Sequence, residues 1–236
     1  MATLFSLESI LLIVLGGILP VFIWLWFWLR EDTARPEPKG LILATFLAGG
    51  AATFPAFVLE KIASTGFHIP EGVLLFTLWA FIEELMKFLA ARLTGEGSRN
   101  YDEPVDSLVY LITAALGFAA VENILFLVYH QETGTALTDF ILGGNLRFLG
   151  ANILHAVASG VAGGIMAFAF YRSKIIKGLF ALFGLATATL LHSIFNTLIM
   201  GSTGGGILIT FAYFWAVATL LILLFERVKK ITPRYV

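Results

Sequence analysis

Apolar runs of about 20 residues recur along the whole chain and constrain its fold more than any other feature. A helix of roughly 20 residues crosses the ~30 Å hydrocarbon core of a bilayer. Hydrophobic residues make up 58% of the sequence and charged residues 13%, whereas soluble domains are roughly 45–50% apolar. The sequence therefore predicts an all-α polytopic membrane protein, with residues 1–236 forming one transmembrane domain within the lipid bilayer.

We expect seven membrane-spanning helices, with boundaries that are accurate to a few residues. They cover residues 8–29, 41–63, 72–93, 105–129, 148–171, 178–200 and 206–226. No Lys or Arg precedes the first run, so we expect a retained helix there and not a cleaved signal peptide. Residues 131–147 are expected to form a connection with room for a short re-entrant or interfacial piece. Pro55 is expected to be the only proline that interrupts a span.

Lysine and arginine are distributed unequally between the connections. Twelve of the 15 cations lie at the end of the third predicted span, after the first, third and fifth spans, or in the C-terminal tail. The positive-inside rule then places the N-terminus outside and the C-terminus in the cytoplasm of a multi-pass plasma-membrane protein. The net charge of -1 indicates no nucleic-acid partner. The absence of cysteine excludes disulfides, thiolate metal sites and a cysteine nucleophile.

Four of the predicted spans carry ionisable or amide side chains within their apolar runs. An ionisable group at the bilayer centre costs at least ~2.5–3.5 kcal/mol, so each one needs a partner, a water-filled cavity or a function. At ~1.5 Å of rise per residue, the carboxylates and imidazoles lie ~10–16 Å below the outer surface. We therefore expect a shared polar cavity in the outer half of the membrane. The candidate residues are Glu83, Glu84, Lys87, Glu122, Asn123, His155, His192 and Asn196.

The spacing of these residues predicts which of them share a helix face. Glu83 and Lys87 are four residues apart, as are His192 and Asn196, so each pair lies on one face about one turn apart. Glu84 is rotated by ~100° from Glu83, and both can line one cavity only if it is wide or if one of them faces a neighbouring helix. The sequence leaves open which of the two glutamates faces water.

Small residues follow His155 and predict close helix packing there. Ser159 and Gly163, like Gly160 and Gly164, have the small-xxx-small spacing that lets helix backbones approach. Close packing at this point would hold the His155 rotamer. Asn152 is interpreted instead as an interhelical hydrogen-bonding residue.

Hydrolysis is one chemistry that this set of residues supports. Burial disfavours the charged form of a carboxylate, which makes Glu83 or Glu84 a candidate general base for water. The histidines either bind a metal that activates this water or donate hydrogen bonds to the oxyanion, and Asn196 suits oxyanion donation. No HExxH motif is present to indicate zinc.

Two other classes of function remain open. Glu and His side chains within spans also serve proton relays and transporters, although the two halves show no inverted repeat. A scaffold subunit could use the same polar network only to hold its partners.

The four motifs, taken in order, resemble the PrsW family of intramembrane proteases. They are EELMK at 83–87, FAAVEN at 118–123, His155 followed by ASGVAGG, and HSIFN at 192–196. The segment REDTARPEPKG is also similar to the family's first cytoplasmic loop. PrsW proteins are related to the CAAX prenyl endopeptidases and to the Aph-1 subunit of gamma-secretase, and the Aph-1 branch supplies the non-catalytic alternative.

The resemblance implies roles for the candidate residues. Glu83 and Glu84 would include the general base, His155 and His192 would bind water or metal, and Asn196 would act as oxyanion or ligand partner. The cofactor would be a divalent metal such as zinc, held by Glu83, Glu84, His155 and His192, or there would be none. The substrates would be single-span membrane proteins, for example anti-sigma factors cleaved by regulated proteolysis in a prokaryotic cytoplasmic membrane.

Overall fold

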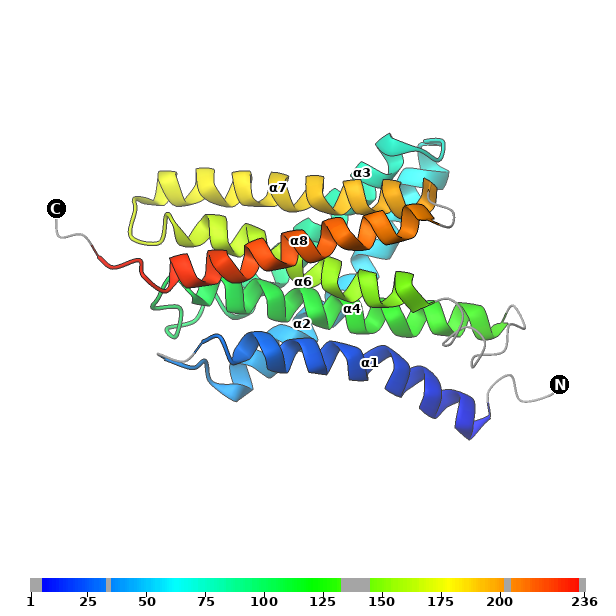
Figure 1. The fold of residues 1–236 in the computed structure, drawn as a ribbon, viewed down its shortest axis with the longest axis horizontal. Coiled ribbons are helices and arrows are strands. Elements are labelled where there is room, and N and C mark those ends of the chain that lie inside the picture. The colour runs from blue at the N-terminus through cyan, green and yellow to red at the C-terminus, as the bar shows by residue number, and fades with distance from the viewer. Residues whose placement is uncertain (1–5, 33–34, 133–144, 202–204, 234–236) are drawn as a thin grey trace.

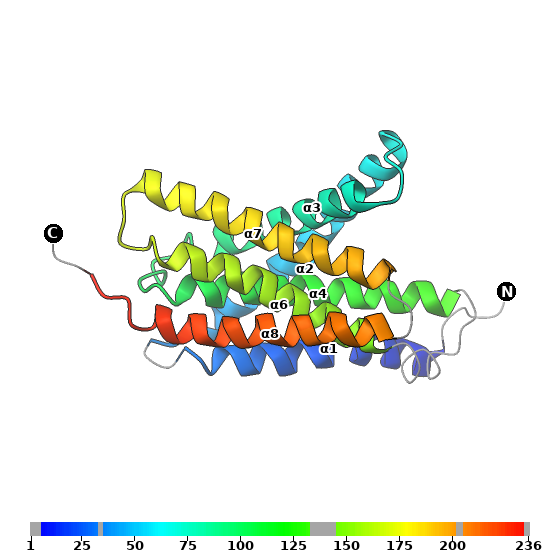
Figure 2. The ribbon, with the colours of Figure 1, turned by 45° about the horizontal axis from the view of Figure 1, so that its top comes forward.

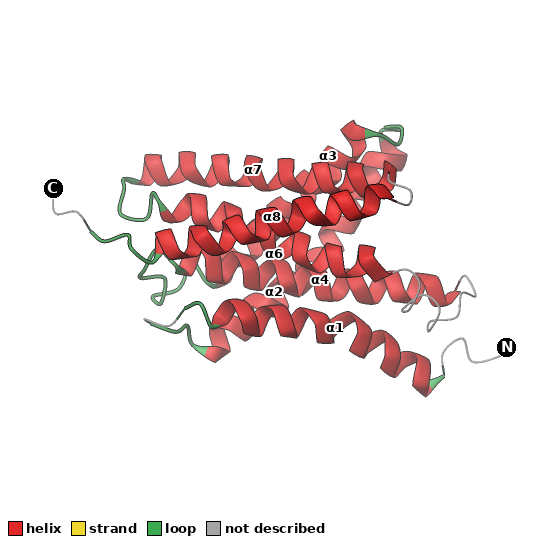
Figure 3. Cartoon of the chain, viewed as in Figure 1, coloured by secondary structure: helices red, strands yellow, loops and turns green. Residues whose placement is uncertain are grey.

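A computed structural model describes residues 6–32, 35–132, 145–201 and 205–233, and this part of the chain is helical without strands (Figure 3). Each predicted span corresponds to one helix, with ends that differ by at most four residues. A π-helical turn, η1 (Ile62–Gly66), extends the second helix. The helices are α1 (Leu7–Leu29), α2 (Lys39–Lys61), α3 (Val73–Thr94), α4 (Asp106–Glu132), α6 (Asn145–Ala167), α7 (Lys174–Gly201) and α8 (Gly205–Val228).

Five helices within the described residues are long and apolar enough to cross a membrane. They are α1, α2 continued by η1, and the greater part of α4, α6 and α7. The other two helices, α3 and α8, are not among the five. The all-helical, multi-pass character of the chain is thus confirmed, while seven crossings and the direction of the termini stay predictions.

The helices run side by side with α4 and α6 in the middle of the bundle (Figures 1 and 2). Nearly every residue of the first half of α4 is buried, including Leu108, Leu111 and Ile112. The start of α1 and the end of α8 lie at opposite ends of the bundle (Figure 1). α3 crosses the others at an angle, so its first turns project from the bundle (Figure 2).

Glycines bring the central helices into backbone contact. A Cβ on Gly49 of α2 would collide with the backbone of Ala114, and one on Gly117 of α4 would collide with the backbone of Phe46. A Cβ on Gly163 of α6 would also collide with the backbone of α4 at Ser107. The close approach that the small residues after His155 predict is therefore confirmed.

Two expectations about chain breaks need comment. Pro20 lies inside α1 as Pro55 lies inside α2, so the expectation that Pro55 alone interrupts a span is wrong. Both helices continue through their proline, because proline removes one hydrogen bond of the helix and the remaining contacts hold it. The re-entrant piece expected within 131–147 falls mainly on residues 133–144, which lie outside the described residues.

Candidate active site

Lys87 of α3 lies at the centre of a buried polar cluster and is 0% exposed. Its Nζ donates to Glu83 Oε2 at 3.2 Å and to Glu84 Oε1 at 2.8 Å, and it lies 2.7 Å from His155 Nδ1. An ammonium has three hydrogens, and here each has an acceptor. The ring of Phe118, 4.7 Å from Nζ, adds a cation–π contact. These contacts allow a charged lysine to be buried inside the bundle.

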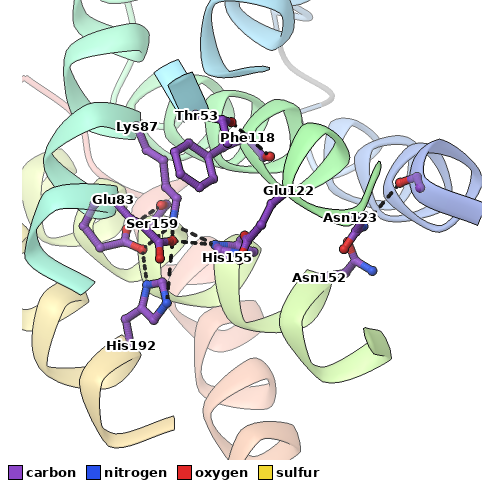
Figure 4. Close-up of polar contacts among 12 residues, drawn as sticks. Thr53, Glu83, Lys87, Phe118, Glu122, Asn123, Asn152, His155, Ser159 and His192 are labelled. Atoms are coloured by element: carbon purple, nitrogen blue, oxygen red, sulfur yellow. Dashed lines mark hydrogen bonds and ion pairs between the residues drawn. The ribbon is translucent and has the colours of Figure 1, made fainter. Parts of the chain in front are cut away.

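His155 of α6 connects this lysine to α4. Because Lys87 can only donate, His155 Nδ1 accepts, and the proton of a neutral imidazole is then on Nε2. Nε2 lies 2.7 Å from Glu122 Oε2, within ion-pair distance. Three helices are joined in this way by one chain of polar contacts, Lys87 to His155 to Glu122 (Figure 4).

Glu84 is enclosed by donors from three helices. It accepts from Lys87, from His192 Nδ1 at 2.8 Å and from Ser159 Oγ at 2.8 Å. Only 2% of Glu84 is exposed. Glu84 therefore holds His192 with its proton on Nδ1, which leaves Nε2 as an acceptor.

Glu83 faces a cavity of about 700 Å³ that α2, α3, α4, α6 and α7 line together. Its Oε2 lies 3.7 Å from His192 Nε2. We call Glu83, Glu84, Lys87, Glu122, His155 and His192 the cavity cluster. The carboxylate, amide and imidazole side chains that line the cavity are Glu60, Glu83, Glu122, Asn123, His155, His192 and Asn196. Six of the eight candidate residues line this cavity, whereas Glu84 and Lys87 are buried and do not line it.

Asn123 lies at the edge of the cavity and points away from the cavity cluster (Figure 4). Its amide nitrogen donates to the carbonyl oxygen of Gly17 at 3.2 Å and to Asn152 Oδ1 at 2.8 Å. These bonds tie α4 to α1 and α6. The contact is the interhelical kind that the sequence indicates for Asn152.

Sequence reasoning overlooked Glu60 and underrated Ser159. Glu60 lies within the predicted span 41–63, and its charge inside an apolar run was the signal that could have identified it. Ser159 was expected only to be small, yet its hydroxyl is a hydrogen-bond donor to Glu84.

Three residues bring possible metal ligands together. Atoms of Glu83, His155 and His192 lie within 4.8 Å of one another, and a carboxylate with two imidazoles is a typical zinc donor set. However, Lys87 Nζ lies 2.7 Å from His155 Nδ1 and 3.2 Å from Glu83 Oε2. An ammonium there engages two of the ligands and repels a divalent cation. The side chains as arranged do not fit a metal ion.

Known proteins resemble the chain over most of its length. The sequence model of the protein family described as "PrsW family intramembrane metalloprotease" matches residues 37–224. Protease PrsW of Geobacillus kaustophilus is 31% identical over 126 residues, which is 53% of this chain and 53% of the relative. Protease PrsW of Bacillus subtilis is 31% identical over 124 residues, covering 50% of this chain and 55% of the relative.

A third relative is matched over more of its length but is less similar. Protease PrsW of Halalkalibacterium halodurans is 24% identical over 189 residues, 78% of this chain and 82% of the relative. The chain spans about half the length of the first two relatives. No solved structure matches the chain significantly. The family match covers far more than half of the sequence, and the chain therefore belongs to the PrsW family.

Proposed function

We propose that this chain is an intramembrane endopeptidase that hydrolyses peptide bonds of single-span membrane proteins, with water activated by Glu83. The observation that carries the proposal is that two adjacent glutamates have different surroundings. Glu84 is enclosed and bonded to three donors, whereas Glu83 faces the cavity next to the acceptor nitrogen of His192. The names of the relatives, all called proteases, support the same reaction class.

A water molecule between Glu83 and His192 would be the nucleophile. The 3.7 Å between Glu83 Oε2 and His192 Nε2 is too long for a direct hydrogen bond and suits a bridging water. Both atoms are acceptors, so the water donates both hydrogens and keeps a lone pair for the substrate carbonyl. As the C–O bond forms, Glu83 takes a proton, and it passes this proton to the leaving nitrogen as the C–N bond breaks.

Other residues of the cavity would hold this arrangement. Asn196 lies one turn beyond His192 on α7, and its amide is a donor for the oxyanion of the tetrahedral intermediate. Lys87 orients Glu83 and Glu84, and Glu122 orients His155. No step requires a metal ion, in keeping with the position of the Lys87 ammonium.

The substrate would enter the cavity laterally, from the lipid. Phe54 and Phe57 of α2 line the cavity, as do Leu125 and Tyr129 of α4, and all four are exposed on the outside of the bundle. In a membrane this surface meets lipid, so the cavity opens toward the bilayer between α2 and α4. A membrane-anchored segment can then reach Glu83 without leaving the lipid.

The charge distribution and the bacterial relatives support a proposal for the cellular setting. We place the chain in a bacterial cytoplasmic membrane, with seven crossings, the N-terminus outside and the site in the outer half. A protein related to anti-sigma factors, cut near its external end, is the substrate class that fits this depth. We also propose that the chain shares a common ancestor with the CAAX endopeptidases and Aph-1.

The test compares wild type with Glu83→Gln after reconstitution in liposomes with quenched single-span peptides. Loss of the base is expected to slow cleavage by about 10²–10⁴-fold at an unchanged unfolding temperature. Asp102→Asn removes an exposed carboxylate outside the cavity and serves as the matched control, with the wild-type rate expected.

Two results would change the proposal. Activity that a strong chelator abolishes and zinc restores would show a metal mechanism, in which Lys87 must leave His155. A wild type that cuts no peptide, with Glu83→Gln affecting only stability or partner binding, would replace the protease by a scaffold.

A further inference from the structure

Glu60 is an acidic residue of the cavity that the proposed hydrolysis does not use. It lies in the last turn of α2, directly before η1, and lines the cavity together with Glu83 and Glu122. All charged side chains that line the described cavity are acidic, because no lysine or arginine is among them. Lys87 is fully buried behind them, and its three hydrogens are engaged.

The histidines do not balance this charge. Neutral rings account for the Nδ1 contacts of both histidines: His155 Nδ1 accepts from Lys87, and His192 Nδ1 donates to Glu84. Around Glu60 the cavity is lined by apolar and aromatic side chains, among them Phe57, Phe76 and Trp79. A carboxylate in such surroundings without a counter-charge costs several kcal/mol, which a cationic ligand would offset.

The backbone at Glu60 is held in place by side chains on both sides. Its carbonyl oxygen accepts from Trp79 Nε1 at 3.4 Å and from Ser64 Oγ at 3.0 Å. The Trp79 bond ties the end of α2 to α3, and the Ser64 bond lies within the turn that leads into the α2–α3 connection. A π-helical turn follows immediately, and such turns are frequent at functional sites.

We propose that Glu60 is a specificity-determining residue that binds a lysine or arginine side chain of the substrate. The inference rests on the proposed protease function. The basic side chain lies on the side of the scissile bond that faces the α2–α3 connection. Its alkyl stem packs against the aromatic lining, and its charged end pairs with Glu60 and contacts the ring faces.

Matched peptides test this directly. A neutral single-span peptide is cut by wild type, and variants carry Lys, Gln or Glu at successive positions on each side of the cleavage point. At one position we expect kcat/KM for Lys to exceed that for Gln by about tenfold, which corresponds to about 1.4 kcal/mol. Glu60→Gln should reduce this ratio to about one, a change of about 1.4 kcal/mol.

Charge reversal separates recognition from a structural role. Glu60→Lys should invert the preference, so that the peptide with Glu is cut faster than the peptide with Lys. Glu71→Gln, which removes an exposed carboxylate of the α2–α3 connection, is the matched control and should keep the wild-type ratio.

The outcomes are distinguishable. Equal cleavage of the Lys and Gln peptides by wild type at every position overturns the role of Glu60 and leaves the protease intact. A Glu60→Lys variant that cuts without inverting the preference also overturns it. Failure of wild type to cut any peptide, the neutral one included, overturns the proposed function and this inference with it.

Discussion

Carboxylates gather at two places in this molecule, and their neighbours differ. In the cavity cluster, Glu84 accepts from Lys87, His192 and Ser159. The second group, which we call the loop carboxyls, lies on the α1–α2 and α3–α4 connections and at the start of α4. It comprises Asp32, Glu37, Glu96, Glu103 and Asp106. Four of the loop carboxyls have a buried oxygen with no donor among the described residues: Asp32, Glu96, Glu103 and Asp106.

Burial shows in the pKa values of the loop carboxyls. Burial raises the pKa of Asp32 and of Glu103, and the two carboxyls lie close enough to interact. Burial likewise raises the pKa of Glu37, although Tyr110 donates to it. Each of these carboxyls is therefore harder to ionise than an exposed one, whereas Glu83 and Glu84 have an ammonium beside them. The comparison teaches that the cavity cluster differs from the loop carboxyls by its fully buried cation, and an adjacent opposite charge favours the ionised form of a carboxylate.

Removal of the ammonium should have the largest effect. Lys87→Met leaves Glu83, Glu84 and Glu122 without their buried cation, and we expect a loss of about 3–5 kcal/mol of folding free energy. Thermal unfolding in detergent, followed by circular dichroism, measures it. The double variant Lys87→Met with Glu84→Gln should recover part of the loss. An unchanged unfolding temperature for Lys87→Met would mean that the cavity cluster does not depend on this charge.

Glu96 should have an intermediate effect on the free energy of unfolding, and this effect should depend on pH. Its side chain is 1% exposed, and burial raises its pKa to about 7 despite Arg92 at 3.2 Å. The unfolded chain loses this proton near pH ~4.3. Stability should therefore fall as pH rises from there through about 7, by about 1–3 kcal/mol.

Glu96→Gln separates this residue from the other loop carboxyls. Unfolding temperatures measured from pH 5 to 8 should decline less steeply in the variant than in wild type. The variant should also be the more stable protein at pH 8. Parallel curves for the two proteins would assign the pH dependence to other groups.

The exposed ion pair next to the loop carboxyls should matter least. Arg35 and Asp102 are 3.2 Å apart, with 68% and 52% of their side chains exposed. Arg35→Ala should cost at most about 1 kcal/mol, less at high salt, in the same unfolding assay. A loss of folding free energy as large as that of Lys87→Met would show that the contribution of a charged residue to stability does not depend on its exposure in these two regions.

The helices were predictable from the sequence because each apolar run is long and bounded by charged or glycine-containing connections. The expected 72–93, for example, is observed as α3 (Val73–Thr94). Proline was harder to judge. A single Pro20 or Pro55 in a long apolar helix costs one hydrogen bond, and packing decides whether the helix continues.

The sequence predicts which residues belong to the candidate site, but not how their side chains are arranged. Spacing correctly pairs Glu83 with Lys87, which are 3.2 Å apart. It could not assign Asn123 to Asn152, because that contact joins α4 to α6 and depends on how both helices are rotated. Glu60 carries a local signal, its charge within the predicted span 41–63, but whether it faces the cavity depends on how α2 is rotated against its neighbours.

By itself the sequence determined that the chain forms apolar helices and that their polar residues must be buried together, because lipid cannot solvate charges. Tertiary structure alone decided which glutamate faces the cavity. One residue turns a helix by ~100°, so the choice between Glu83 and Glu84 depends on the neighbouring helices. The partners that decide this choice are distant in sequence. His155 is 68 residues from Lys87, and His192 is 108 residues from Glu84.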